Sequence, residues 1–361
     1  MIRKTIKSSF LSNPIGRRGF LAKGVTLAAT VAAPSVLRGT TAGRVYVRTT
    51  GGTAEEGLRR AWFSPFQKDT GIEVVPTVVD AAKILAMAQT GNVSVDVTVH
   101  TVPEMSNLTK RGALDRLDYS RFTLTDPKDL DRIADTWMAK SIYATVIGYN
   151  TATFSTEHPT SWADFWDIRK FPGRRMLQDA SVEYPNLEQA LLADGVPMDR
   201  LYPLDVDRAF KMMRQIKPEI VKFWDSGAVS AQLLSDRVAV AGSIWDSRIL
   251  PIKQAGAPVA IEWNQAMRNQ FCLGLVKGAP NKDSAYKFMD YGLSPRIQAV
   301  TAKEAILAPA NKRAYDYIDN SLAQTLSSYP EHAAKGFVNN GEWWSDNIEP
   351  VRNRWREFLL E

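Results

Sequence analysis

Apolar and polar residues follow a repeated strand–helix order in the first part of the chain. Alternation over residues 44–48 predicts a strand. Apolar positions at helical spacing then predict a helix over 54–70 that ends at Gly71. The same patterns predict a strand, a helix and a strand at residues 72–79, 81–89 and 93–100. This β-α-β-α-β order predicts a parallel sheet with helices on both faces.

A second α/β unit is predicted over residues 150–264, after an apolar strand at 142–149. Its predicted helices are 162–166, 186–194, 206–216 and 228–234, and its predicted strands are 174–178, 220–224 and 238–244. The apolar run 271–276 predicts a strand that returns to the first unit. Helices are expected at 283–292 and 295–301. Apolar residues at helical spacing over 339–361 predict a helix that packs on the fold rather than a membrane anchor.

The ends of the predicted strands carry residues suited to binding a small molecule. Ligands of open α/β sheets bind beyond the carboxyl ends of the strands. In the first unit, these ends carry Thr50, Gly52, His100 and Thr101. In the second unit, Trp245 ends a strand and is followed by Asp246 and Arg248. Each of these residues has an ordinary alternative role, in core packing, a turn, a helix cap or a surface ion pair.

The first 42 residues predict export. Arg17 and Arg18 are followed by Phe20, Leu21 and Lys23, and then by the small and apolar run 25–33. A basic stretch before an apolar segment of this length is typical of a secretory signal and too short to span a bilayer. The paired arginines resemble the signal of the twin-arginine export route. We expect cleavage near Ala42.

Charge and cysteine content exclude several classes of protein. The chain has 45 basic and 39 acidic residues, but seven basic residues precede Arg44, so the remainder is nearly neutral. No basic patch with interleaved aromatic residues stands out, so no nucleic-acid partner is expected. The single Cys272 excludes an internal disulfide and a cysteine metal cluster. Its apolar surroundings favour a buried, inert thiol.

The sequence lacks the residue patterns that most enzymes need. Its three histidines are isolated, and neither a Gly-x-Ser-x-Gly segment nor a phosphate-binding glycine loop occurs. We therefore predict no catalytic residue, no metal site and no cofactor. A binding protein is favoured over an enzyme, although an exported hydrolase or lyase remains the alternative from another class.

Several segments, in order, resemble bacterial extracellular solute-binding proteins of ABC importers. The resemblance starts with the first strand and the helix that ends in Phe66-Gln67-Lys68-Asp69-Thr70-Gly71, and continues at Val95-Asp96-Val97-Thr98-Val99. It includes Ile147-Gly148-Tyr149-Asn150-Thr151, the segment from Thr160 to Trp166, and Phe171-Pro172-Gly173. It ends with the helix 285–293, then Ser294-Pro295, and with Ala308-Pro309-Ala310-Asn311.

The resemblance implies a two-lobe periplasmic binding protein fold of type II. Each α/β lobe would hold a mixed, mainly parallel sheet flanked by helices, with the ligand cleft between the lobes. The implied organisation is a signal peptide over 1–42, a first lobe over 43–149 and 270–312, and a second lobe over 150–269 and 313–361. The implied partners are a small solute and an inner-membrane ABC permease, and we expect a monomer in the periplasm. A sensor coupled to a chemoreceptor would share the same site.

Within the family, the chain resembles the spermidine/putrescine binders most. That resemblance assigns Trp245 to stacking on the ligand and the stretch holding Asp179 and Glu183 to supplying an acid. Three cation contacts of the polyamine pattern are missing, because Thr50-Gly51-Gly52, Thr101-Val102-Pro103 and Asn269-Gln270-Phe271-Cys272 replace them. A polyamine-like solute is favoured, and a small anionic solute such as an organic acid or amino acid is the alternative. In that case Arg248 is expected to hold the anion.

Overall fold

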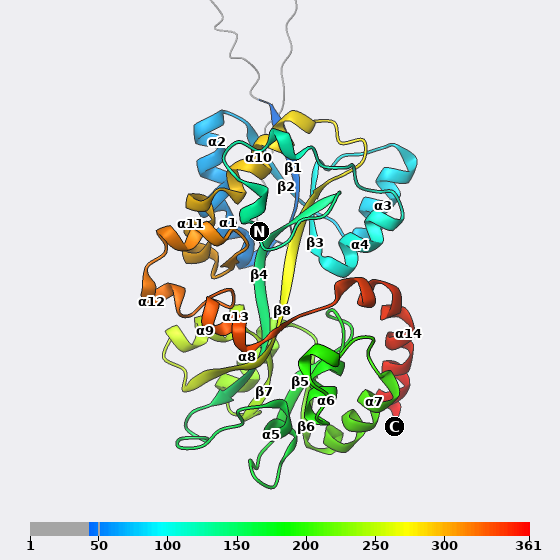
Figure 1. The fold of residues 1–361 in the computed structure, drawn as a ribbon, viewed down its shortest axis with the longest axis vertical. Helices are drawn as coiled ribbons and strands as arrows, with labels where there is room; N and C mark the ends of the chain where they lie inside the picture. The colour runs from blue at the N-terminus through cyan, green and yellow to red at the C-terminus, as the bar shows by residue number, and fades with distance from the viewer. Residues whose placement is uncertain (1–42, 50) are drawn as a thin grey trace, which may run out of the picture. The chain divides into compact units, whose positions relative to one another are not determined.

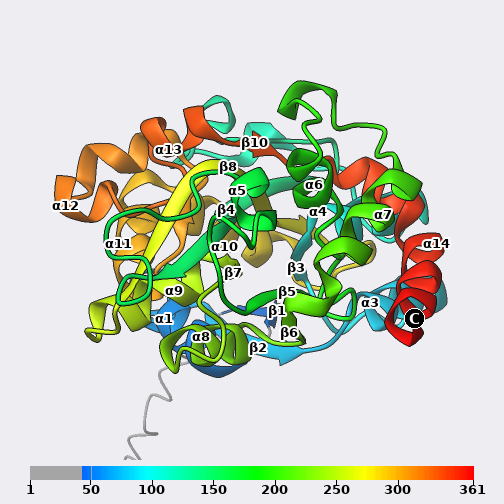
Figure 2. The same cartoon turned by 90° about the horizontal axis from the view of Figure 1, so that it is seen from below.

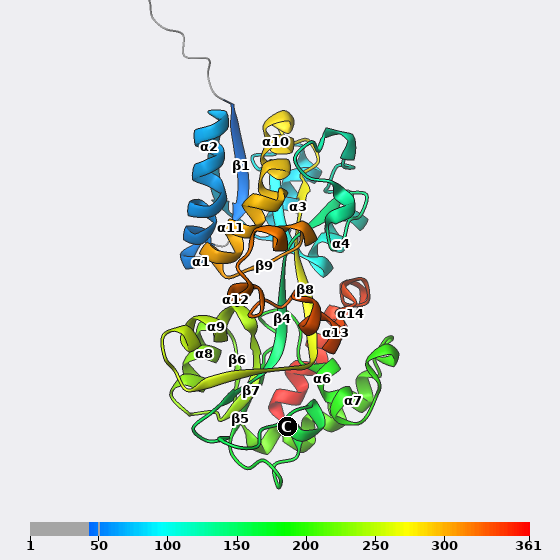
Figure 3. The ribbon, with the colours of Figure 1, turned by 60° about the vertical axis from the view of Figure 1, so that its left-hand side comes forward.

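Two long antiparallel strands, β4 (Trp137–Asn150) and β8 (Val259–Leu275), form the centre of the sheet. The computed structural model describes residues 43–49 and 51–361. Within that part of the chain the sheet has ten strands. Eight follow the order β2-β1-β3-β8-β4-β7-β5-β6, and the two-residue strands β9 and β10 (Phe337–Val338) pair with β4 and β8 outside this order. Figures 1 and 3 show β4 and β8 side by side, running from one group of elements to the other.

The first group is built on β1 (Arg44–Thr49), which pairs in parallel with β2 (Glu73–Val78) and β3 (Val97–Thr101). Its helical segments are α1 (Gly52–Leu58), a π-helical turn (Arg59–Phe63), α2 (Ser64–Thr70), α3 (Ala81–Thr90), α4 (Val102–Lys110), α10 (Lys282–Leu293) and α11 (Pro295–Ala305). Leu273 of β8 joins the hydrophobic cluster of α2 and α10, whereas the adjacent Cys272 joins that of α3 and α4. Helices therefore cover both faces of the sheet, because successive strand residues point to opposite faces.

The second group repeats this arrangement, with β5 (Arg175–Gln178) parallel to both β6 (Ile220–Trp224) and β7 (Ala241–Trp245). Its helices are α5 (Trp162–Trp166), α6 (Leu187–Ala193), α7 (Val206–Ile216), α8 (Gly227–Ser235) and α9 (Asp246–Gln254). One hydrophobic cluster contains residues of α5, α6 and α7, and another contains residues of α8 and α9. The predicted two-lobe α/β fold is confirmed.

The central strands differ most from the sequence-based expectation. β4 starts at Trp137 rather than at 142, and β8 starts at Val259 rather than at 271. The first part of each strand contains polar residues that interrupt its apolar run. These parts are nevertheless strands, because β4 and β8 pair with each other in the sheet. Near the middle of β4, the two-residue strand β9 (Ala308–Pro309) pairs with Ser141 and Ile142.

The C-terminal helix α14 (Gly341–Leu360) packs on the fold, as predicted. Trp344, Val351, Trp355 and Phe358 are buried in the cluster of α5, α6 and α7. Figure 2 shows α14 beside α7, and its first turns also contact α4. None of the helices in the described part of the chain is long and apolar enough to cross a membrane.

One buried carboxyl group connects α14 to α6. Glu188 is fully buried, and its Oε1 accepts hydrogen bonds from the Tyr202 hydroxyl at 2.5 Å and from Trp344 Nε1 at 2.6 Å. Burial raises the pKa of Glu188 to about 7, against the opposing effect of these hydrogen bonds. The folded protein therefore holds Glu188 protonated below neutral pH, where the unfolded chain does not.

We expect Glu188→Gln to stabilise the protein at high pH. The pKa of Glu188 is higher in the folded protein than in the unfolded chain. Between the ordinary pKa of a glutamate and about pH 7, the folded state therefore binds one more proton than the unfolded chain, and the free energy of unfolding falls as the pH rises. Glutamine resembles the protonated acid, so at about pH 8 the substitution should add roughly 1–3 kcal/mol to the free energy of unfolding. At about pH 5 it should add little. Urea unfolding at both pH values measures the difference, and an equal effect at both would contradict a buried neutral Glu188.

Candidate functional site

A cavity of about 800 Å³ lies along the central strands, with walls from both groups of elements. One wall comes from β1, α1, the π-helical turn and residues 304–307, and the other from α8, α9 and Trp245. In Figure 1, α1 and α11 lie above the middle of the central strands, and α8 and α9 lie below it. A cavity of this size suits a small molecule held by a few convergent polar groups.

Lys140 reaches the cavity because the pairing of β4 with β8 is irregular. The register shifts between Ala139 and Ser141, so Lys140 is an extra residue in the strand. Strand residues three apart normally point to opposite faces, yet Lys140 and Tyr143 both line the cavity. A bulge of this kind re-aims side chains. Lys140 is 4% exposed, and burial lowers its pKa to about 8.

Arg48 presents a second cation from the end of β1. Its Nε donates a hydrogen bond to the Val79 carbonyl at 2.9 Å, and its Nη1 donates to the Val99 carbonyl at 2.6 Å. Burial lowers the pKa of Arg48, with Glu104 and Asp80 opposing the shift, but an arginine stays charged at neutral pH. Two donors are thus fixed by carbonyl groups, which holds the guanidinium in place for a carboxylate.

Glu183 supplies a carboxyl group on the same cavity. Its Oε1 accepts a hydrogen bond from the Tyr143 hydroxyl at 2.6 Å. Its Oε2 is buried and has no hydrogen-bond partner among the described residues. Burial raises the pKa of Glu183 to about 7, although the Tyr143 hydrogen bond opposes the shift. The group therefore changes charge near neutral pH and has one oxygen free for a donor.

Aromatic rings form a continuous part of the wall. Phe271 of β8 stacks on Tyr143 with ring centroids 4.7 Å apart. Trp245 meets Tyr143 edge to face at 6.0 Å and is itself supported by Trp224 at 5.2 Å. Such rings offer an apolar surface for methylene groups and a negative face for an ammonium group. Trp245 therefore lies where the sequence-based hypothesis places a ligand wall.

Arg248 lines the cavity from the first turn of α9. Its Nε is buried without a hydrogen-bond partner in the described part of the chain. The side chain passes over Gly227, where an added Cβ would lie 2.6 Å from that Nε. The absence of a side chain at Gly227 thus creates the space that Arg248 occupies beside the cavity.

The other predicted site residues lie elsewhere. Asp179 accepts a hydrogen bond from Trp355 Nε1 at 3.0 Å, and buried Asp246 accepts from the N–H groups of Ala144 and Ser247. His100 is buried 3.3 Å from Glu104, whose carboxylate also accepts from the Thr101 N–H. None of these four predicted residues is among the described cavity walls. Gly52 is the first residue of α1, and Thr50 lies outside the described residues.

The structure thus brings together Glu183, Trp245 and Arg248 from the predicted set. The lining residues that were not predicted include Arg48, Lys140, Tyr143 and Phe271. For Lys140, the available signal in the sequence was a charged residue between Ala139 and Ser141, next to an apolar strand. No group of three His, Cys, Asp or Glu side chains in the described residues could hold a metal ion.

Comparisons with known proteins agree with this architecture. The family of bacterial extracellular solute-binding proteins matches residues 61–334. The gamma-aminobutyric acid-binding protein of Pseudomonas aeruginosa is 31% identical over 317 residues, which cover 85% of this chain and 88% of that protein. The solved Atu4243-GABA receptor is 32% identical with a TM-score of 0.81, covering 88% of this chain and 97% of that one. The spermidine/putrescine-binding periplasmic protein of Escherichia coli is 24% identical over 292 residues, or 78% and 82% of the two chains.

Proposed function

The chain belongs to the bacterial extracellular solute-binding proteins, and from this premise we propose that its ligand is a small amino acid of the GABA type, bound as a zwitterion. The chain is a periplasmic solute-binding receptor of an ABC importer. Its relatives are solute-binding proteins, which favours a receptor over the exported hydrolase or lyase.

The observation that carries the proposal is the pair Lys140 and Glu183. Lys140 and the carboxylate oxygen Oε2 of Glu183 are buried around one cavity, and neither side chain has an ion-pair partner within 4 Å among the described residues. Burying a charge without a partner costs free energy, and a ligand that supplies the partner recovers it. A zwitterion supplies both partners at once. Its carboxylate would accept hydrogen bonds from Lys140 and Arg48, and its ammonium would donate to Glu183 Oε2 beside the aromatic wall.

A polyamine is the second candidate, and the resemblance to spermidine/putrescine binders supports it. The ammonium site of Glu183 and the aromatic rings would suit one end of a polyamine. Its other ammonium would face the cations Lys140, Arg48 and Arg248 that line the cavity. The lining also contains acids, but Glu55 and Glu304 are in ion pairs with Arg59 and Arg60, and Glu56 is exposed to solvent. Like charges repel, so the three cations favour a carboxylate at that end. A purely anionic solute would leave Glu183 without a partner.

The proposal includes a route to the periplasm and a division into lobes. The twin arginines, the apolar run behind them and the small residues near Ala42 support export by a twin-arginine signal that spans residues 1–42. That segment lies outside the described residues. We propose the lobes as 43–149 with 270–312 and 150–269 with 313–361, acting as a monomer. Closure of the lobes on the solute would be the state that the permease recognises.

Mass spectrometry of the purified protein tests the proposal without a chosen ligand. The protein is isolated without denaturant, and the small molecules released on unfolding are identified. We expect a molecule with one carboxylate and one amine. Release of a polyamine would overturn the zwitterion proposal while retaining the receptor. Conversion of a released solute into a product by the refolded protein would support the enzyme alternative.

The pH dependence of affinity should be bell-shaped. Burial raises the pKa of Glu183 to about 7 and lowers that of Lys140 to about 8. Below about pH 7, Glu183 takes up a proton and loses its attraction for the ammonium group. Above about pH 8, Lys140 loses its charge and no longer attracts the carboxylate. The dissociation constant for GABA, measured by calorimetry, should be lowest between these values. Glu183→Gln should remove the acidic limb and Lys140→Met the alkaline limb, and a flat profile in the natural protein would contradict these roles.

A further inference from the structure

A second cavity, of about 600 Å³, lies on the central strands near β9. We call it the hinge cavity, because it lies on β4 and β8, the strands that link the two groups of elements. Its lining consists of Asp131, Ile142 of β4, Arg268 of β8 and residues between 309 and 333. The segments around it are a 3-10 helix (Lys312–Tyr317), α12 (Asn320–Ala323) and α13 (Pro330–Lys335). Figure 3 shows α12 and α13 at the level of the central strands. The two cavities share no lining residue in the described part of the chain.

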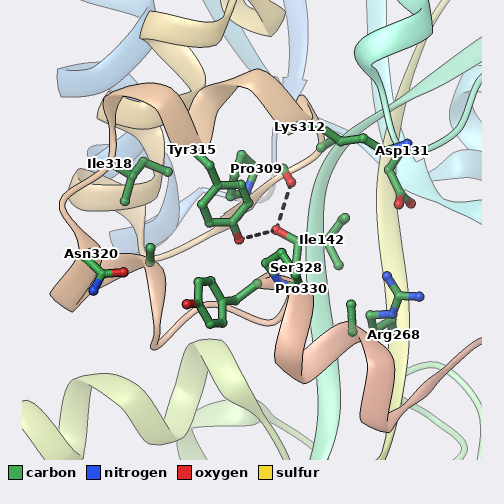
Figure 4. A pocket seen from close by; sticks show the side chains of 14 residues that line it. Asp131, Ile142, Arg268, Pro309, Lys312, Tyr315, Ile318, Asn320, Ser328 and Pro330 are labelled. Carbon is green, nitrogen blue, oxygen red and sulfur yellow. Dashed lines mark hydrogen bonds between the residues drawn. The ribbon is translucent and has the colours of Figure 1, made fainter.

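Most of the wall of the hinge cavity is apolar. The apolar lining consists of Ile142, Pro309, Ala310, Ile318, Ala323, Pro330 and Ala333. Tyr315 and Tyr329 add two rings, and the Tyr315 hydroxyl is held by Ser328 Oγ at 2.8 Å. Ser328 in turn donates to the Pro309 carbonyl at 3.1 Å, as Figure 4 shows. Because this hydroxyl is already bonded within the wall, the Tyr315 ring contributes chiefly apolar surface.

One side of the hinge cavity is charged. Asp131, Arg268 and Lys312 line the cavity, and Figure 4 draws them on the same side of the view. Asp131 accepts a hydrogen bond from Gln270 Nε2 at 2.9 Å. Neither Arg268 nor Lys312 has an ion-pair partner within 4 Å among the described residues, and the buried Nε of Arg268 has no hydrogen-bond partner there. Two cations and one acid give this side a net positive charge, which favours an anionic group.

We propose that the hinge cavity is a second ligand site, for a small carboxylic acid with an apolar, ring-sized body. The carboxylate would pair with Arg268 and Lys312, and the body would contact Ile142, Tyr315 and Tyr329. A cavity of this volume holds such a molecule, and an unpartnered guanidinium gains more from a carboxylate than from any neutral acceptor. The proposal is independent of which solute occupies the larger cavity.

The position of this site connects it to the larger cavity. Ile142 lies between Ser141 and Tyr143 in β4, and Arg268 of β8 pairs with Ala144 of β4. An occupant therefore contacts the same strands that carry Lys140, Tyr143 and Phe271. A ligand in the hinge cavity is placed to influence the strands that link the two groups of elements.

Binding of 4-fluorobenzoate, followed by ¹⁹F NMR on the purified protein, tests the proposal. We expect saturable binding that weakens about fivefold or more in Arg268→Gln and in Ala333→Trp, which fills the cavity. Lys140→Met and Trp245→Ala, in the other cavity, should leave it unchanged. In the natural protein, the neutral 4-fluorobenzyl alcohol should bind more weakly than the acid. The affinity for the alcohol should be the same in Arg268→Gln as in the natural protein. Circular dichroism verifies that each variant is folded.

Two results would overturn the site. One is the absence of saturable 4-fluorobenzoate binding to the natural protein. The other is binding that survives in both Arg268→Gln and Ala333→Trp but is lost in Lys140→Met, which would place the probe in the larger cavity. Neither result depends on whether GABA or a polyamine is the transported solute, so the two proposals fail separately.

Discussion

Replacing Lys140 with methionine is expected to weaken binding of a GABA-type zwitterion by roughly 2–4 kcal/mol, or about 30- to 1,000-fold. Lys140 is the buried cation beside the aromatic wall, and its removal leaves the ligand carboxylate without a charge-assisted hydrogen bond in a poorly hydrated place. Isothermal titration calorimetry measures the loss. Lys140→Arg should recover only part of it, because the planar guanidinium is longer and differently shaped.

The same substitution separates a binding role from a structural one. Burial lowers the pKa of Lys140, so the charged form is unfavourable in the folded protein without ligand. Lys140→Met should therefore raise the melting temperature of the ligand-free protein by a few degrees. The exposed Lys287 gives a matched control, since Lys287→Met should change neither quantity. A Lys140→Met protein that melts earlier but binds GABA normally would show that Lys140 has a structural role only.

Trp245→Ala is expected to weaken binding by about 1–3 kcal/mol, which is about 5- to 150-fold. The ring gives the cavity a flat wall at the end of β7 and contacts Tyr143 edge to face. Its loss removes the apolar surface, the favourable interaction with the ammonium group and the exclusion of water. Intrinsic fluorescence or calorimetry measures the change.

The control for Trp245 is another partly buried tryptophan. Trp263 stacks on His332 at 4.0 Å and does not line the described walls of the larger cavity. Trp263→Ala should leave affinity unchanged within about twofold. Normal binding by a poorly stable Trp245→Ala protein would instead place Trp245 in the core.

The order of strands and helices was predictable because each element has a local signal. The alternation of β1, the helical spacing before Gly71 and the apolar spacing of α14 all lie within short stretches of sequence. At the candidate site, the end of β7 indicated Trp245 in the same local way. Thr101 shows the limit, because the Thr101-x-x-Glu104 pattern also indicates a helix start, and the Thr101 N–H does bond Glu104.

The orientation of Lys140, Tyr143 and Phe271 could not be predicted in this way, because it depends on pairing over a long sequence distance. Ser141 pairs with Phe271, and the shift in register beside it decides the face on which Lys140 lies. A change of one residue in register reverses the face of every following side chain. Arg48 likewise required the positions of the Val79 and Val99 carbonyl groups, which belong to different segments.

The most direct test of the zwitterion proposal is calorimetric titration with three solutes of four carbon atoms each that carry different terminal charges. GABA carries one ammonium and one carboxylate, putrescine carries two ammonium groups, and succinate carries two carboxylates. At about pH 7.5 and constant ionic strength, GABA is predicted to bind at least about tenfold more tightly than either of the others. Tighter binding of putrescine, or equal binding of all three, would contradict the assignment of Lys140 and Glu183 to opposite ends of the ligand.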